Sequence, residues 1–537
     1  MEGATILRLQ TMMSAGETSS VRLCQAYLER IDSFDRNGPA IHAVIELNPD
    51  ALGLAEALDQ EREDGHVRGP LHGVPILVKD NIDTRDRMQT TAGSLALEGH
   101  RAARDATIVR RLRSAGAVLL GKANLSEWAN FRGKRSVSGW SSRGGLTRNP
   151  YALDRSACGS SSGSAAAVAA GFCAVAVGTE TDGSIICPSQ TNGIVGLKPT
   201  LGLLSRSGII PISHSQDTPG PMARSVEDAA VLLGALTGMD SRDPATRGSK
   251  GRAHRDYARY LDRDGLRGAR LGVARNMLGS DPRPTALLES ALDVIRKLGG
   301  VVIDPADVPN YDKFGDAEVD VLLYEFKADL NRYLGSLGRR AGVHSLDDVI
   351  RFNEENRDQV MPYFGQERMT AANEKGPLTD RKYRQSRAKA RRLARQEGLD
   401  AAFRKHRLDA IVVISGGPAW MIDLANGDPR SWDMESTSPP AVAGYPHITV
   451  PVGFVFGLPV GISFIGKAWQ EAKLLRLAYA FEQATQVRRP PHFAPTAAPS
   501  WASATSAREP DASPTNSRES LAEMDLLESH KPAGEMI

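Results

Sequence analysis

The 537-residue sequence has only four cysteines, and no two of them have the C-x-x-C spacing of a redox or zinc site. Four cysteines are also too few for a disulfide framework in a chain of this length. We therefore expect free thiols and a reducing, cytoplasmic setting. The cysteines are Cys24, Cys158, Cys173 and Cys187.

Long apolar runs are absent as well. The most apolar stretch, residues 165–178, has 14 residues including two glycines, whereas a helix needs about 20 residues to cross a bilayer. The first thirty residues lack the basic segment and apolar core of a secretory signal, and their apolar spacing predicts an amphipathic helix. We expect no transmembrane segment and no signal peptide.

Neither sign of charge is in excess. The 66 lysines and arginines nearly balance the 64 aspartates and glutamates, which gives a formal net charge of +2. These charges are spread along the chain, so the sequence predicts no basic surface for nucleic acid or for an anionic membrane. The expected partner is a small or neutral molecule.

The sequence does contain short β-branched runs that alternate with helical patterns, over residues 70–236 and 408–485. This alternation is typical of an α/β protein. In the clearest helical segment, Asp105 stands at a predicted N-cap, and Gly116 marks the end. The runs predicted as strands are GVPILVK, AVLLG, CAVAVG, DAIVVI and VGISFIG.

Two other segments have a different composition. Residues 240–407 contain long charged helical patterns, with strand signals nearly confined to RLGVA and VVI, and we interpret them as a helical insertion. From residue 491 to 537, proline, alanine, serine and threonine dominate without periodicity. Such a segment buries too little apolar surface to offset the entropy cost of ordering, so we predict a disordered tail.

Two short motifs suggest chemistry that their surroundings do not support. GAVLLGKA has the glycine and lysine spacing of a phosphate-binding loop, but its interior reads as a buried strand and its last residue is not a serine or threonine. GSSSG fits the G-x-S-x-G nucleophile elbow, with Ser161 as nucleophile and His214 or His447 as base. An elbow follows directly from a strand, whereas the preceding residues are polar and include a proline, which predicts a loop entering a helix.

A larger pattern spans residues 72–200. Lys79 lies in HGVPILVKDNIDT, Ser160 opens the run of three serines, and Ser184 follows 24 residues later in GTETDGSIICPSQTNGIVGLKPT. Together with GSLALEGHR, NLSEWANFRG and SGWSSRGG, these segments resemble the amidase signature family, and within it the bacterial peptide amidases. The resemblance is dense from about residue 70 to 235, returns at YPHITVPVG and GLPVGISFIG, and fades over 241–407.

This resemblance implies one large domain over residues 1–490, in which helices cover both faces of a central mixed β-sheet and residues 240–407 form a more variable insertion. It also implies a Ser-Ser-Lys triad: Ser184 is the nucleophile, Ser160, preceded by a cis peptide bond, relays the proton, and Lys79 is the base. It implies neither a metal nor a cofactor. The implied oxyanion hole consists of the backbone amides of Thr181, Asp182, Gly183 and Ser184, and the further expected substrate contacts are Ser161 and Met88.

The residues around Lys79 suit a basic role. A serine hydroxyl attacks an amide only when a base takes its proton, and a lysine is such a base only when neutral. Lowering a lysine pKa from about 10.4 to roughly 7 or 8 costs on the order of 4 kcal/mol, which burial must supply. The apolar strand Val74–Val78 would place the Lys79 amine at a buried strand end. Ser161 and Ser162 are expected to cap the following helix or to order the loop.

Ile186 departs from the family pattern, because arginine is common at its position. Its loss argues against a free carboxylate beside the scissile bond and for a neutral or extended substrate. The implied activity is hydrolysis of a carboxamide through an acyl-enzyme, with C-terminal amides of peptides as the expected substrates. Aryl acylamidase and ester or carbamate hydrolase activities remain open, as does a glutaminase subunit of a tRNA-dependent amidotransferase. Pocket walls are expected at Met88–Ser94 and Tyr324–Leu334.

Overall fold

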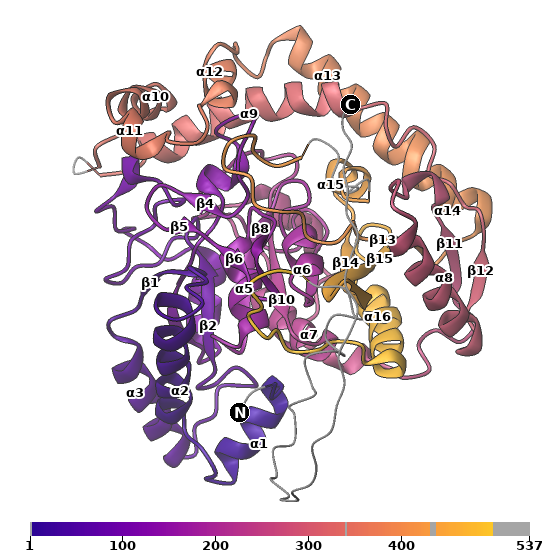
Figure 1. The fold of residues 1–537 in the computed structure, drawn as a ribbon, viewed down its shortest axis with the longest axis horizontal. Helices are drawn as coiled ribbons and strands as arrows, with labels where there is room; N and C mark the ends of the chain where they lie inside the picture. The colour runs from indigo at the N-terminus through magenta and orange to yellow at the C-terminus, as the bar shows by residue number, and fades with distance from the viewer. Residues whose placement is uncertain (1–2, 339–340, 430–435, 498–537) are drawn as a thin grey trace, which may run out of the picture. The chain divides into compact units, whose positions relative to one another are not determined.

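A mixed β-sheet runs through the protein (Figure 1). The computed structural model describes residues 3–338, 341–429 and 436–497. In this described part, eleven strands form the sheet in the order β1-β3-β2-β8-β10-β9-β14-β15-β13-β11-β12. The strands are β1 (Val44–Leu47), β2 (Pro75–Lys79), β3 (Val118–Ala123), β8 (Val175–Glu180), β9 (Val195–Lys198), β10 (Thr218–Ala223), β11 (Arg270–Val273), β12 (Val301–Ile303), β13 (Ala410–Ile414), β14 (His447–Val455) and β15 (Leu458–Ile465).

The sheet combines both kinds of strand pairing. Strand β2 pairs in parallel with β3 and β8, whereas β10 pairs antiparallel with β8 and β9. Two small sheets lie apart from it, β4 (Trp140–Ser141) with β5 (Gly145–Leu146) and β6 (Arg148–Asn149) with β7 (Ala152–Ser156). The predicted α/β class with a mixed sheet is therefore confirmed.

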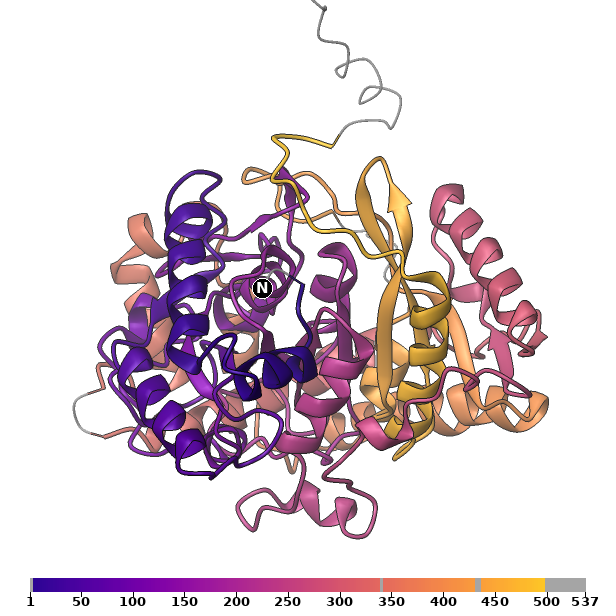
Figure 2. The same ribbon diagram turned by 90° about the horizontal axis from the view of Figure 1, so that it is seen from below.

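Helices bury the central strands. Every residue of β2, β8 and β15 is buried, which requires cover on both faces of the sheet because successive side chains of a strand point to opposite sides. Figures 1 and 2 show the helices arranged around the sheet. The α-helices are α1 (Ile6–Ser14), α2 (Ser20–Ile31), α3 (Ala51–Glu63), α4 (Thr107–Ser114), α5 (Ser162–Ala170), α6 (Ile186–Thr191), α7 (Val226–Leu236), α8 (Pro282–Lys297), α9 (Gly315–Gly335), α10 (Leu346–Glu355), α11 (Arg357–Val360), α12 (Glu367–Asn373), α13 (Arg381–Arg391), α14 (Asp400–His406), α15 (Ser438–Ala443) and α16 (Glu471–Thr485).

The predicted helix after Asp105 is α4, but Asp105 does not cap it. Ala106 occupies the N-cap position, and no side chain caps the helix. The Asp105 carboxylate instead accepts a hydrogen bond from the backbone amide of Arg85 at 2.6 Å and pairs with Arg113. A tertiary partner has displaced the local cap.

The segment predicted as a helical insertion contains part of the sheet. Strands β11 and β12 are the RLGVA and VVI runs, and both pair in parallel at one end of the sheet. The rest is helical, with α9 packed against α12 and α13. No helix of the described residues is long and apolar enough to span a membrane.

Residues 491–497, which belong to the predicted tail, pack against the rest of the chain. The ring of Phe493 stacks on Phe34 with centroids 5.0 Å apart. The backbone amide of Leu153 donates to the carbonyl of Ala494 at 2.8 Å. The remainder of the predicted tail, residues 498–537, lies outside the described residues.

Candidate active site

Lys79 ends strand β2 with its amine fully buried. Its Nζ lies 2.7 Å from Ser160 Oγ, 3.0 Å from Ser161 Oγ and 2.9 Å from Thr179 Oγ1. Burial lowers the pKa of Lys79 to about 7, although the charges of Asp217 and Glu180 oppose the change. Near neutral pH this amine is therefore shared between the charged form and the neutral form that accepts a proton.

Ser160 follows a cis peptide bond from Gly159. Gly159 has no room for a side chain, because a Cβ atom would overlap Ser126 Oγ. The Ser160 carbonyl accepts a hydrogen bond from the amide of Ser126 at 3.1 Å. The serine run is thus fixed by its packing against a neighbouring loop.

Ser161 holds Lys79 and does not cap helix α5. Its hydroxyl donates to the Thr179 carbonyl at 3.0 Å, besides its contact with Lys79. It stands at the N-cap position of α5 without a capping hydrogen bond. The predicted cap is therefore wrong, whereas the Ser162 hydroxyl bonds to the Cys158 carbonyl and orders the loop.

Ser184 lies in the loop that leaves strand β8, and it is 8% exposed. Its carbonyl accepts a hydrogen bond from the amide of Ser161 at 3.2 Å, which joins the nucleophile loop to the serine run. Gly183, with φ +76°, makes the turn. Within the described chain, the Ser184 hydroxyl makes no hydrogen bond, so the structure brings Lys79 and Ser160 into contact without closing the link to Ser184 Oγ.

The backbone amides of residues 181–184 have no hydrogen-bond partner among the described residues. The loop is held instead by Glu180, whose carboxylate accepts from the amides of Ile185 at 2.7 Å and Ile186 at 3.0 Å. Unpaired amides in a fixed loop are suited to stabilise an oxyanion. Sequence reasoning missed Glu180, although its place at a strand end next to the motif was a signal.

A cavity of about 1160 Å³ opens next to these residues. Its volume lies at the top of the ~300–1,000 Å³ range of small-molecule sites. Of the predicted walls, the helix segment Tyr324–Leu334 contributes Asp329, Arg332 and Tyr333, whereas the described lining contains nothing from Met88–Ser94. Met88 is fully buried in the hydrophobic core, so the structure does not support it as a substrate contact.

Comparison with known proteins agrees with this geometry. The amidase family model matches residues 22–475. The structure resembles that of native peptide amidase from Stenotrophomonas maltophilia with a TM-score of 0.88 and 54% identity, covering 92% of this chain and 99% of that one. The chain belongs to the amidase family. It is accordingly a hydrolase that acts on amide bonds.

Other relatives of this amidase differ in their described roles. A probable amidase of Arabidopsis thaliana is 41% identical over 502 residues, covering 92% of each chain. One component of an amidotransferase, from the glutamyl-tRNA(Gln) amidotransferase of Symbiobacterium thermophilum, is 38% identical, covering 89% of this chain and 96% of that component.

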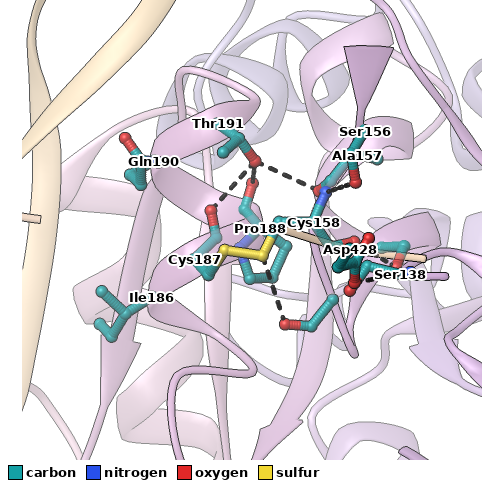
Figure 3. The surroundings of a disulfide bond; sticks show 12 residues. Ser138, Ser156, Ala157, Cys158, Ile186, Cys187, Pro188, Gln190, Thr191 and Asp428 are labelled. Atoms are coloured by element: carbon teal, nitrogen blue, oxygen red, sulfur yellow. Dashed lines mark hydrogen bonds between the residues drawn. A yellow bond between two sulfur atoms is a disulfide. The ribbon is translucent and has the colours of Figure 1, made fainter. Parts of the chain in front are cut away.

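The amidase has a disulfide bond beside the two serine loops, contrary to the predicted free thiols. Cys158 and Cys187 are bonded, with Cα atoms 5.9 Å apart, and Figure 3 shows how the bond joins helix α6 to the segment before the serine run. Thr191 bonds to the carbonyls of Ala157 and Cys187 and reinforces this link. The other two cysteines are free and buried. The disulfide removes the argument from free thiols for a reducing compartment.

A second group of acids borders the nucleophile loop. Asp217 is buried, and its carboxylate accepts from the Thr181 hydroxyl at 2.7 Å; burial raises the pKa of Asp217 to about 6. The Gln216 amide bridges the Thr181 carbonyl and Glu318 of helix α9. Burial and the charge of Asp182 raise the pKa of Glu318 well above its usual value. Glu318 has no motif around it, so sequence reasoning could not find it.

The elbow interpretation finds no support in this amidase. A short strand, β7, does precede the serine run, but it pairs only with β6 and does not belong to the large sheet. Ser161 contacts Lys79 and Thr179 but no histidine. His447 is buried in strand β14, where its ring contacts Ser463.

His214 belongs to a different cluster on the cavity wall. Its Nδ1 lies 2.7 Å from Asp329 and its Nε2 3.2 Å from Glu325, and these three are the described residues close enough together to hold a metal ion. Burial opposes protonation, but the hydrogen bond to Asp329 and the charges of Glu325 and Asp329 raise the pKa of His214. With both ring nitrogens against carboxylates, the cluster suits a protonated imidazole.

Proposed function

We propose that this amidase removes the C-terminal carboxamide of peptides through an acyl-enzyme on Ser184. The observation that carries the proposal is the buried Lys79 amine, 2.7 Å from Ser160 Oγ and with a pKa of about 7. The 54% identity to a peptide amidase supports the substrate class.

In the proposed first step, Ser184 Oγ attacks the amide carbon and its proton passes through Ser160 to neutral Lys79. The unpaired amides of Thr181, Asp182, Gly183 and Ser184 stabilise the oxyanion, and one such donor is typically worth about a hundredfold or more in rate. The proton returns along the same route to the leaving ammonia. Water then attacks the ester by the reverse path and releases the acid.

The surroundings of Ser184 support a neutral scissile group. Ile186 is fully buried and supplies no charge where arginine is common in the family. The large cavity supports an extended substrate, because a simple aliphatic amide would leave most of it unfilled. We expect peptide amides to react faster than small amides for this reason.

The test is ammonia release from a C-terminally amidated peptide, compared with aniline release from an aryl anilide and ammonia release from an aliphatic amide. Ser184→Ala protein serves as the blank. The proposal predicts turnover of the peptide amide with the highest kcat/KM. Turnover of the anilide alone would show an aryl acylamidase and refute the peptide assignment.

Variants of the triad test the roles of its members. Ser184→Ala is expected to abolish turnover, and Ser160→Ala to lower kcat by about 10²–10⁴-fold, the usual contribution of a proton-transfer group. Ser164→Ala is a matched control, since this buried hydroxyl makes only one long hydrogen bond, 3.4 Å to the Val177 carbonyl. An active Ser184→Ala protein would refute the proposed nucleophile.

A glutaminase component of a tRNA-dependent amidotransferase is the second candidate, supported by the 38% identity to an amidotransferase component. Such a component would need partner proteins for its physiological reaction. Full peptide-amide activity of the purified single chain favours the free-standing enzyme. Glutamine hydrolysis that appears only with added partner proteins would favour the alternative.

A further inference from the structure

Three arginines form a row on one wall of the cavity. Arg387 and Arg391 belong to helix α13, and Arg395 belongs to the π-helical segment η7 (Arg392–Leu399) that continues it. Side chains four residues apart lie on the same helix face. All three line the cavity, and Figure 1 shows α13 running along α9.

No carboxylate among the described residues forms an ion pair with these three arginines. Arg387 Nε donates to Ser215 Oγ at 3.1 Å, and Arg395 Nε donates to the Tyr445 hydroxyl at 3.0 Å. The nearest acid behind the row is Asp400, which accepts from the same Tyr445 hydroxyl at 2.7 Å. The row therefore keeps most of its guanidinium donors free for a ligand.

Other arginines of the same cavity are neutralised. Arg206 pairs with Asp243 at 2.6 Å, and Arg332 pairs with Asp329 at 2.9 Å. Burial, together with the charges of Arg395 and Arg387, lowers the pKa of Arg391. Like charges four residues apart on a helix destabilise it, so an uncompensated row is favourable only where an anion joins it.

We propose that Arg391, with Arg387 and Arg395, binds a carboxylate in the acyl part of the substrate, away from the scissile amide. This proposal rests on the proposed function and narrows its substrates to peptide amides that carry an aspartate or glutamate before the C-terminal residue. The planar guanidinium group binds a carboxylate through two parallel hydrogen bonds, which matches the free donors of the row.

The cavity connects this row with the catalytic groups. Thr179 and Thr181 also line it; Thr179 contacts Lys79, and Thr181 adjoins the nucleophile loop. One extended peptide in the cavity would reach both regions. The carboxylate would then lie far from Ser184, in agreement with the neutral residue at Ile186 beside the nucleophile.

The experiment compares two amidated peptides that differ only by glutamate or glutamine before the C-terminal residue. Turnover is measured for the wild-type chain, Arg391→Gln and Lys389→Gln. Lys389 is a matched control, because it is exposed on the same helix but does not line the cavity. Binding of both peptides to Ser184→Ala protein, with and without Arg391→Gln, is measured by calorimetry and needs no turnover.

We expect the wild-type chain to prefer the glutamate peptide by about 5- to 10-fold in kcat/KM at low salt, as for an unscreened charge-assisted pair. Arg391→Gln removes this preference, and Lys389→Gln keeps it. An equal glutamate-to-glutamine ratio in wild type and Arg391→Gln overturns the proposal. Selective binding without turnover supports the arginine site and refutes the peptide amidase function, whereas no binding of either peptide overturns both.

Discussion

At the scale of single residues, Lys79 shows how burial sets the chemistry. Shifting a lysine pKa from 10.5 to about 7 corresponds to a penalty on the order of 5 kcal/mol against the charged amine. Three hydroxyl groups, of Ser160, Ser161 and Thr179, surround the amine and compensate part of its lost hydration. The apolar strand before Lys79 made this burial predictable, but the hydroxyl partners come from segments 81 to 100 residues away.

The pKa of Lys79 predicts the pH dependence of the enzyme. Only the neutral amine accepts a proton, so kcat/KM is expected to rise with pH and to reach half of its plateau near pH 7, where the pKa of Lys79 lies. Initial rates with a peptide amide between pH 5 and 9 measure this limb. A flat profile across that range would contradict the role of Lys79 as the base.

At the scale of elements, the disulfide links the two catalytic loops. It joins Cys158, two residues before Ser160, to Cys187, three residues after Ser184, with a sequence separation of 29. Sequence reasoning missed it because spacing alone does not reveal which distant cysteines meet. Closing a loop of this length is worth roughly 3–4 kcal/mol in the chain-entropy account.

Replacing both cysteines tests this link. Cys158→Ser with Cys187→Ser is expected to lower the free energy of unfolding by about 3 kcal/mol and to lower kcat, because both loops lose their common anchor. Urea denaturation and steady-state kinetics measure the two effects. Dithiothreitol added to the double variant is the control and should change nothing; unchanged stability of the double variant would contradict the account.

Arg132 connects the NLSEWANFRG segment with the α11–α12 region. It is fully buried, pairs with Glu127 at 3.0 Å and donates to the Phe364 carbonyl at 3.0 Å. Its guanidinium also lies 4.0 Å from the Phe364 ring centroid. The motif was visible in the sequence, but this structural role was not.

Removing one partner of this pair is expected to be costly. Arg132→Ala should destabilise the protein by about 3–5 kcal/mol, since it leaves the Glu127 carboxylate buried without its cation. Urea denaturation gives the value. The double variant Arg132→Met, Glu127→Leu should recover much of the loss, and equal losses for both variants would contradict the charge argument.

At the scale of the whole molecule, apolar runs predicted the strands well, including β11 and β12 within the variable segment. Their β-branched pattern is a local signal that survives folding. The cavity wall was less predictable. Tyr333 was expected there, but the arginine row and Glu318 were not, because helical spacing does not say which face of α9 or α13 meets the catalytic loops.

The contacts of residues 491–497 can be tested by truncation. Phe493 stacks on Phe34, and Thr496 bonds to Asp154 at 2.6 Å. Deleting residues 498–537 keeps these contacts and should leave Tm unchanged, whereas deletion from 491 onward should lower it by roughly 2–4 °C, as for a loss of about 1 kcal/mol in a large domain. Equal Tm values for both truncations, measured by calorimetry, would contradict a stabilising role of these contacts.

The central claim is that Ser184 carries the acyl group. The most direct measurement is peptide mapping by mass spectrometry after acid quench of a reaction with an activated ester, which acylates faster than the enzyme deacylates. We expect one acyl group per chain, on Ser184, and none in the Ser184→Ala protein. An acyl group on Ser160 or Ser161, or full turnover without any acyl-serine, would contradict the account.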